Sequence, residues 1–196
     1  SVIGDGDGPV SPYALQKYYD EMQCRLWSKI YGLDTVSLRY FNVYSEDQKA
    51  TTAYATAIAN WMQHIREDKT PFLNGDGKNR RDMLHVSAAV SANLFAMEYD
   101  GIFNGCCYDV GTGENISLNE IIEIIHKYFP EVEFEKRPPR KGDVLLTKAR
   151  ISKLKKLGWQ AQVQIGDGIN SCFSKLKKYK LGEGRSQLRN NNHGAY

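Results

Sequence analysis

The sequence predicts an α/β fold in which parallel strands alternate with helices. Short runs of β-branched and aromatic residues alternate along the chain with longer segments whose apolar residues recur every three or four positions. This alternation is typical of parallel strands joined by helical crossovers. Of the 196 residues, 25% are charged and 41% are hydrophobic, which are ordinary values for a folded domain and argue against wholesale disorder.

The first helix is predicted to begin at Ser11-Pro12, because serine is a favoured N-cap and proline suits the first helical position. Its apolar residues continue at helical spacing to Tyr31, and Gly32 stands where a C-terminal cap is expected. Residues 35–44 are rich in β-branched and aromatic side chains and predict a strand. A second helix is expected over residues 50–66.

Shorter elements are predicted in the rest of the chain. Strands are expected at 71–73, 82–86, 107–110 and 132–135, and helices at 87–98, 118–129, 151–157 and 166–179. Ser87 is expected to cap its helix, and Ser117 with Glu120 has the pattern of a capping box. Residues 74–77 predict a turn, and 137–142 are expected to be irregular. From Gly182 the chain is polar, and a flexible tail is expected.

Composition and cysteine usage exclude several classes of protein. The net charge of +3 is too small to argue for nucleic-acid binding, and no run of about 18 apolar residues predicts a membrane span. The first residues lack the pattern of a signal peptide. The spacing of the four cysteines fits no zinc site, so no metal is expected. We expect buried, reduced thiols and a cytoplasmic protein. The cysteines are Cys24, Cys106, Cys107 and Cys172.

Tyr13 and Lys17 are the first candidates for chemistry. They are four residues apart near the start of a predicted helix, so their side chains lie on one face. An ammonium beside a phenol favours the phenolate, and such a tyrosine can take and return the proton of a sugar hydroxyl. This spacing alone is common on helix surfaces, so the neighbouring motifs have to decide its meaning.

Five separate motifs occur in a recognisable order. They are Ser11-Pro-Tyr-Ala-Leu-Gln-Lys17, Leu38-Arg-Tyr-Phe-Asn-Val-Tyr44, Gly75-Asp-Gly77 with Arg81-Asp82 and His85-Val86, Tyr108-Asp-Val-Gly-Thr-Gly113, and Arg140-Lys-Gly-Asp143. In this order they resemble the extended short-chain dehydrogenase/reductase family, and within it the NAD-dependent nucleotide-sugar epimerases. The resemblance extends from Ser1 to about Lys178.

The resemblance implies the C-terminal part of a Rossmann-type dinucleotide-binding domain plus a smaller α/β substrate-binding lobe. Residues 1–47 would end the dinucleotide-binding domain, and 85–113 would return to it. Residues 48–84 and 114–180 would build the substrate-binding lobe, and 181–196 would be the flexible tail.

The resemblance also implies NAD as cofactor. Tyr13 would be the catalytic tyrosine, which takes the proton of the sugar's 4-hydroxyl while C4 is oxidised to a 4-keto intermediate. Lys17 would hold the nicotinamide ribose and tune Tyr13. Tyr40 and Phe41 would lie beside the nicotinamide.

The substrate implied by the resemblance is a nucleotide sugar, most simply a UDP-hexose or UDP-N-acetylhexosamine. Asn42 would contact its diphosphate or sugar, and Arg81 and Arg140 would bind the diphosphate through their guanidinium forks. Asp143 would accept hydrogen bonds from the nucleotide ribose. Thr147 would stand beside the sugar as a small gatekeeper, which leaves room for an N-acetyl group.

Other residues are interpreted more plainly. Asp82 is expected to hold a turn or cap a backbone segment, and His85 is expected to pack at a helix start. In the family the helix with the tyrosine and lysine pairs across a dimer, so a homodimer is expected.

Two departures bear on activity. The family's catalytic Ser or Thr would precede Ser1, and no Gly-rich phosphate loop is present, so the isolated chain is expected to be inactive. Related 4,6-dehydratases and decarboxylases carry a glutamate where Ser1 stands, which favours the epimerase. The dehydratase or decarboxylase and a non-catalytic nucleotide-sugar-binding module remain as alternatives.

Overall fold

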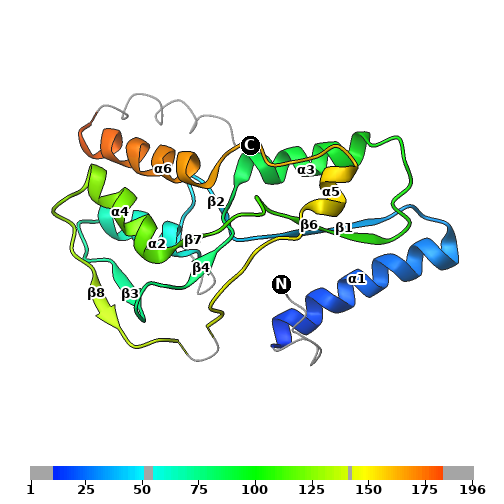
Figure 1. Cartoon of the computed structure of the whole chain (residues 1–196), viewed down its shortest axis with the longest axis horizontal. Helices are drawn as coiled ribbons and strands as arrows, with labels where there is room; N and C mark the ends of the chain where they lie inside the picture. Colours follow the sequence, from blue (N-terminus) through cyan, green and yellow to red (C-terminus); the bar gives the residue numbers. More distant parts are fainter. Residues whose placement is uncertain (1–10, 51–54, 141–142, 183–196) are drawn as a thin grey trace, which may run out of the picture. The chain divides into compact units, whose positions relative to one another are not determined.

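The computed structural model describes residues 11–50, 55–140 and 143–182. This part of the chain forms two compact units, each assembled from segments far apart in the sequence (Figure 1). The first unit is Ser1–Val43, Arg81–Asn115 and Thr147–Val163, and the second is Tyr44–Arg80, Ile116–Leu146 and Gln164–Tyr196.

The first unit begins with the long helix α1, Pro12–Tyr31. The Ser11 hydroxyl accepts the backbone N–H of Ala14 at 3.1 Å, and Pro12 occupies the first helical position. Gly32 ends the helix with φ of 66°, a left-handed conformation that glycine adopts without steric cost. Both predicted ends of this helix are therefore confirmed.

A parallel pair of strands lies at the centre of the first unit. Strand β1, Val36–Tyr40, pairs with β6, Cys106–Val110, and Tyr40 stands opposite Val110 at the end of the register. The predicted parallel architecture is confirmed.

The strand predicted over residues 35–44 is interrupted at Asn42, which has φ of 33°. After this break the short strand β2 covers Val43–Tyr44. The Asn42 carbonyl accepts the N–H of Leu84 at 3.3 Å, while its amide nitrogen donates to the Asp82 carbonyl at 2.7 Å. These contacts with a segment 40 residues away hold the break, and the strand propensity of residues 35–44 does not reveal them.

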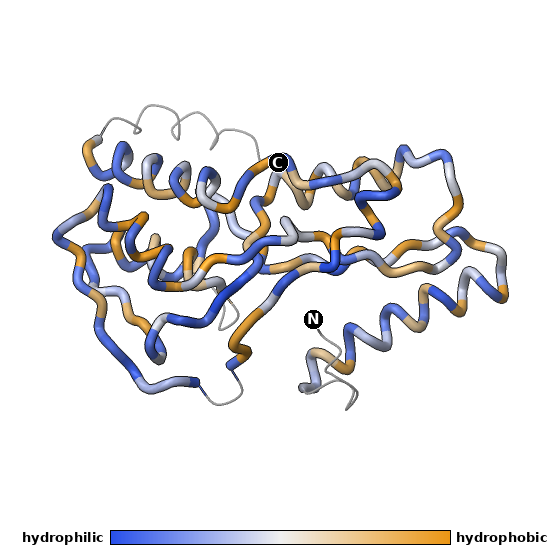
Figure 2. Tube along the Cα trace, viewed as in Figure 1, coloured by the Kyte–Doolittle hydropathy of each residue, from blue (hydrophilic) through white to orange (hydrophobic). Residues whose placement is uncertain are grey.

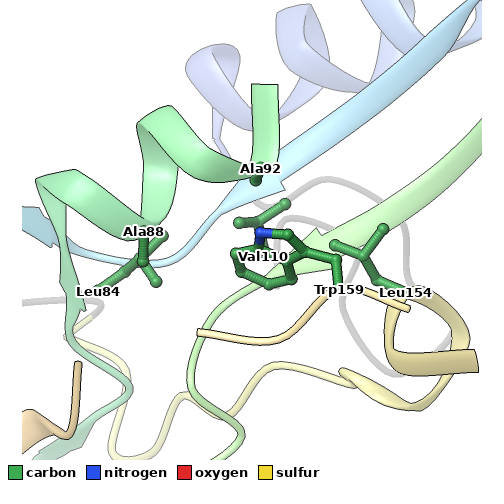
Figure 3. Packing of buried hydrophobic residues seen from close by; sticks show 6 residues of the cluster. All are labelled: Leu84, Ala88, Ala92, Val110, Leu154 and Trp159. Atoms are coloured by element: carbon green, nitrogen blue, oxygen red, sulfur yellow. The ribbon is translucent and has the colours of Figure 1, made fainter. Parts of the chain in front are cut away.

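A small apolar core joins two helices of the first unit, α3 and α5, to its sheet (Figure 3). Helix α3, Val86–Glu98, follows strand β5, Leu84–His85, and α5 covers Ser152–Lys156. The side chains that point into this core are Leu84, Ala88, Ala92, Val110, Leu154 and Trp159.

Two expectations for the first unit are corrected. His85, and not Ser87, is the N-cap of α3, because its Nδ1 accepts the N–H of Ser87 at 3.3 Å. Residues 147–163 were expected in the substrate-binding lobe but lie in the first unit. The reason is that Leu154 and Trp159 bury their side chains in the same core as Val110.

The second unit is built around three helices, α2 at Ala57–Arg66, α4 at Leu118–Tyr128 and α6 at Ile165–Lys180. Helix α6 contacts both others. The fully buried side chains between them include Ile58, Met62, Ile121, Ile125, Ile169 and Phe173.

The N-terminus of α4 is capped as predicted. The Ser117 hydroxyl accepts the N–H of Glu120 at 3.1 Å, and the Glu120 carboxylate accepts the N–H of Ser117 at 2.8 Å. Helix α2, by contrast, starts at Ala57 and not at residue 50, because the Thr56 hydroxyl caps it by accepting the N–H of Ala59 at 3.2 Å.

A second parallel pair joins β3, Phe72–Asn74, to β8, Glu135–Arg137. The strand expected at 132–135 is thus displaced toward the C-terminus, because the N–H of Glu135 is the first to pair, with the Pro71 carbonyl at 2.9 Å. The predicted turn after β3 is present, with positive φ at Gly75 and Gly77. Two further strands are two residues long, β4 at Arg80–Arg81 and β7 at Ile116–Ser117.

The four cysteines are all free thiols. The expectation that they are buried holds for Cys172 in α6 but is wrong for Cys106, which is exposed at the start of β6; Cys24 and Cys107 are half-buried. Within the described ranges, none of the helices has the length and apolar character needed to cross a membrane. The predicted tail beyond Gly182 lies outside the described residues.

Candidate functional site

Tyr13 and Lys17 lie on the first two turns of α1, as predicted. Both side chains are exposed, and the Lys17 ammonium is 6.0 Å from the centre of the Tyr13 ring. The Lys17 ammonium also contacts the Asp20 carboxylate at 3.1 Å, and this hydrogen bond raises the pKa of Lys17. Sequence reasoning missed Asp20, although its spacing of three residues from Lys17 was a usable signal.

Tyr40 and Phe41 differ in what they present at the end of β1. Tyr40 is 42% exposed, whereas Phe41 is 6% exposed and its N–H donates to the Val110 carbonyl at 3.1 Å. The Tyr40 ring is therefore accessible to a ligand of the first unit, while the Phe41 ring belongs to the core.

Asn42 and Thr147 are brought together although they are 105 residues apart. The Asn42 amide nitrogen lies 3.3 Å from the Thr147 hydroxyl oxygen and donates to the Asp82 carbonyl at 2.7 Å. The N–H of Asp82 lies 3.1 Å from both the carbonyl and the hydroxyl oxygen of Thr147. The amide nitrogen of Asn42 and the hydroxyl of Thr147 are thus both held by the protein itself.

Asp82 is the centre of this arrangement and is completely buried. Its carboxylate accepts the N–H and the hydroxyl of Thr112 at 2.9 and 2.8 Å, and the N–H groups of Gly113 and Ala149 at 3.0 Å each. Four donors compensate for taking the carboxylate out of water. The interpretation of Asp82 as a residue that holds backbone segments is confirmed. Gly111 permits the close approach, because a Cβ there would lie 2.4 Å from that of Ala149.

Arg140 and Asp143 line a hollow of about 770 Å³ in the second unit. The N–H of Asp143 donates to the Arg140 carbonyl at 3.2 Å, and the Asn79 amide donates to the Asp143 carboxylate at 2.8 Å. With its amide oxygen toward Arg140, Asn74 accepts two hydrogen bonds from the guanidinium at 3.1 and 3.2 Å. The lining is Leu73, Gly75, Asp76, Asn79, Asn119, Lys136, Arg137, Pro139, Arg140, Asp143 and Leu145.

The hollow carries both basic and amide groups. Arg137 contacts the Glu135 carboxylate at 2.7 Å and its guanidinium stacks 3.9 Å from the centre of the Phe72 ring. Lys136 and Asn119 also line the hollow, and sequence reasoning did not select either. Such groups suit a phosphorylated, hydrogen-bonding ligand.

The predicted site residues are divided between the two units. The first unit holds the tyrosine, the lysine and the residues near Asp82, and it also holds Arg81 in β4. The second unit holds Arg140 and Asp143.

Comparison with known proteins identifies the family. The model of the NAD dependent epimerase/dehydratase family matches residues 3–111. The chain belongs to this family. The predicted fold class, a Rossmann-type α/β protein, is confirmed with it.

Several relatives of this family are similar over most of the chain. A putative UDP-glucose 4-epimerase of Methanocaldococcus jannaschii is 32% identical over 172 residues, which are 86% of this chain and 54% of the relative. The UDP-glucose 4-epimerase of Thermotoga maritima, solved with UDP-glucose, is 31% identical with a TM-score of 0.78, covering 88% of this chain and 55% of that one.

A third relative is the UDP-N-acetylglucosamine 4-epimerase of Methanobrevibacter ruminantium, solved with UDP-N-acetylmuramic acid. It is 29% identical with a TM-score of 0.77 and covers 89% of this chain and 55% of that one. The chain therefore spans about half the length of the relatives it matches.

NAD is the cofactor of this family. The exposed Tyr13, Lys17 and Tyr40 of the first unit have the hydroxyl, ammonium and aromatic groups that suit a ribose and a nicotinamide ring. Buried Phe41 does not fit a side-chain contact with the cofactor. The residues present thus fit the nicotinamide end of NAD, with this one exception.

Proposed function

We propose that the complete protein is an NAD-dependent 4-epimerase of a UDP-hexose or UDP-N-acetylhexosamine. The observation that carries the proposal is the pair Tyr13 and Lys17, exposed on consecutive turns of α1 with the ammonium 6.0 Å from the phenol ring. The family that matches the chain and the relatives of known structure agree with this reaction class.

Tyr13 acts as the proton acceptor and donor of the proposed reaction. Its phenolate takes the proton of the 4-hydroxyl as the sugar becomes a 4-keto sugar, and its phenol returns a proton when the epimer forms. When bound beside Tyr13, Lys17 and Tyr40, NAD would supply the hydride acceptor and donor for C4 of the sugar. Lys17 carries a positive charge beside Tyr13, and its hydrogen bond to Asp20 raises its pKa further.

The remaining groups bind the substrate. Arg140 and Arg81 bind the diphosphate, Asp143 accepts hydrogen bonds from the nucleotide ribose, and Asn42 contacts the diphosphate or the sugar. The lining of the hollow around Arg140 and Asp143 supports the assignment of these two residues. Binding energy from the nucleotide, remote from C4, retains the sugar while it turns over between the two hydride transfers.

Thr147 is proposed as the residue that sets the size of the sugar pocket. A threonine there is small enough to leave space for an acetamido group at C2. Its hydroxyl is held by Asp82 and Asn42, so the proposal rests on the small volume of the side chain and not on a hydrogen bond to the sugar.

A homodimer that pairs through α1 is part of the proposal. Four apolar residues of α1 are 50–58% exposed, Leu15, Met22, Leu26 and Ile30. Their spacing of four and seven residues puts them on one side of the helix, and exposed apolar surface on a helix suits a protein–protein contact. Light scattering on the complete protein should give a dimer that Leu26→Glu converts to a monomer, whereas Gln16→Glu leaves it intact. A dimer that persists in Leu26→Glu contradicts this interface.

The reaction is tested by incubating the complete protein with NAD and each UDP-sugar and separating the products by chromatography. The proposal expects the C4 epimer, and it expects no turnover by residues 1–196 alone. A product lighter by one water would instead indicate the dehydratase. Tight binding of the nucleotide sugar without any product would indicate a non-catalytic module.

A further inference from the structure

Helix α1 is held in the first unit by a narrow line of small and polar side chains. Its buried residues are Ala14, Glu21 and Ser28, seven positions apart. Hydrophobic residues recur along the helix (Figure 2), but Met22 and Leu26 are each half-exposed. Polar contacts therefore carry much of the attachment of α1, and Glu21 is the charged residue among the three buried ones.

The Glu21 carboxylate forms a two-pronged ion pair with Arg39 of β1. The Arg39 Nε and Nη2 atoms each lie 2.5 Å from a Glu21 oxygen, and Glu21 is 8% exposed. Cys107 donates to the same carboxylate at 3.3 Å, and Asp109 lies 3.6 Å from a third nitrogen of Arg39. Burial raises the pKa of Glu21, but the hydrogen bonds from Arg39 and Cys107 lower it to below its ordinary value.

The two ends of this ion pair lie next to residues of the proposed active site. Glu21 follows Lys17 by one helical turn and Tyr13 by two, and Arg39 directly precedes Tyr40. A guanidinium held through two parallel hydrogen bonds constrains both distance and angle between the elements that carry the pair. The pair thus fixes α1 along β1.

We propose that Glu21 and Arg39 are positioning residues that set where Tyr13 and Lys17 stand relative to the end of β1. This inference rests on the proposed function. Net stability is a weak reason for such a pair, because a buried ion pair often adds little compared with apolar residues of similar volume. Precise placement is a stronger reason, since displacements of about 1 Å can cost about 100-fold in rate.

The test uses Glu21→Gln in the complete protein, with Glu98→Gln as the matched control at an exposed helical position of the same unit. Hydrogen exchange and steady-state kinetics are measured well below the unfolding temperature. We expect the amides of residues 14–20 to exchange about tenfold faster, with little change in α3. We expect kcat to fall about 10- to 100-fold with KM within about twofold, while Glu98→Gln resembles wild type.

A second variant separates positioning from folding. The exchanged pair Glu21→Arg with Arg39→Glu restores opposite charges, and a recovery of kcat above that of either single variant supports the inference. Unchanged exchange in residues 14–20, or an unchanged kcat in Glu21→Gln, overturns it. Wild-type protein that turns over no UDP-sugar counts against the proposed function, and the exchange measurement alone then decides whether Glu21 positions the helix.

Discussion

The Asp82 carboxylate accepts hydrogen bonds from both the backbone N–H and the side-chain hydroxyl of Thr112, at 2.9 and 2.8 Å. Through this contact and those with Gly113 and Ala149, one buried residue connects the segment after β6 with the segment that leads into α5. The same residue holds Asn42 and Thr147, so its integrity matters for the proposed site as well as for the first unit.

Asp82→Asn is expected to lower the free energy of unfolding of the first unit by about 1.5–3 kcal/mol, the range for hydrogen bonds to charged groups. An amide has the shape of the carboxylate, but its NH₂ group faces the N–H and hydroxyl donors that the carboxylate accepts. Urea unfolding followed by the fluorescence of Trp159, a core residue of this unit, measures the effect. Asp100→Asn, at an exposed position, is the control, and equal stability of the two variants would disprove the role of Asp82.

Arg140→Ala should weaken binding of the nucleotide sugar by about 1.5–3 kcal/mol, because a charge-assisted hydrogen bond to the diphosphate is lost. NAD binding should be unchanged, since Arg140 belongs to the hollow of the second unit. Calorimetric titration with each ligand checks both statements. Arg66→Ala removes a cation that lies over Tyr179, outside the hollow, and should alter neither. A loss of NAD affinity in Arg140→Ala would refute the assignment.

Thr147→Tyr should reduce kcat/KM for UDP-N-acetylglucosamine far more than for UDP-glucose, because a clash acts on the larger sugar. Thr147→Val is the matched variant. It keeps the volume and loses the hydroxyl that Asp82 and Asn42 hold, so it should cost stability and leave the ratio of the two substrates unchanged. Equal losses on both substrates in Thr147→Tyr would mean that another residue sets the pocket.

Glu21 predicts a specific dependence of stability on pH. Its pKa is lowered in the folded protein despite burial, through hydrogen bonds from Arg39 and Cys107. A carboxylate whose pKa is lowered by folding stabilises the folded protein at pH values above its ordinary pKa of 4.5. This stabilisation is lost as the pH falls through the pKa of the folded state. The difference in unfolding free energy between wild type and Glu21→Gln should therefore shrink from about pH 6 to about pH 3. A difference that stays constant or grows on acidification contradicts the ion pair.

The sequence predicted both ends of α1 and the start of α4 correctly, because residues within one turn of each end determine them. Ser11, Pro12 and Gly32 define α1 because caps act within one turn, and the capping box at Ser117 works in the same way. The break at Asn42 was not predictable, because its partners lie 40 and 105 residues away.

The candidate site divides in the same manner. The spacing of Tyr13 and Lys17 predicted that they share one face of the helix. The motif at 140–143 selected Arg140 and Asp143, which both line the hollow. The periodicity of apolar residues predicted helix α1 correctly, but it did not predict that Ala14, Glu21 and Ser28 are its buried residues. Glu21 can be buried because Arg39, on the strand after the helix, pairs with its carboxylate. Lys136 joins the hollow through the pairing of β8 with β3, which no local pattern reveals.

The proposed role of Tyr13 as the acid–base residue of a nucleotide-sugar epimerase predicts the turnover of Tyr13→Phe. Tyr19→Phe is the matched control, since it removes a hydroxyl from another exposed tyrosine of α1. We predict that Tyr13→Phe binds the nucleotide sugar nearly as wild type does but loses about 10²- to 10⁴-fold in kcat, while Tyr19→Phe keeps its activity. A Tyr13→Phe variant that retains more than about a tenth of the wild-type rate would show that another group takes the proton of the 4-hydroxyl.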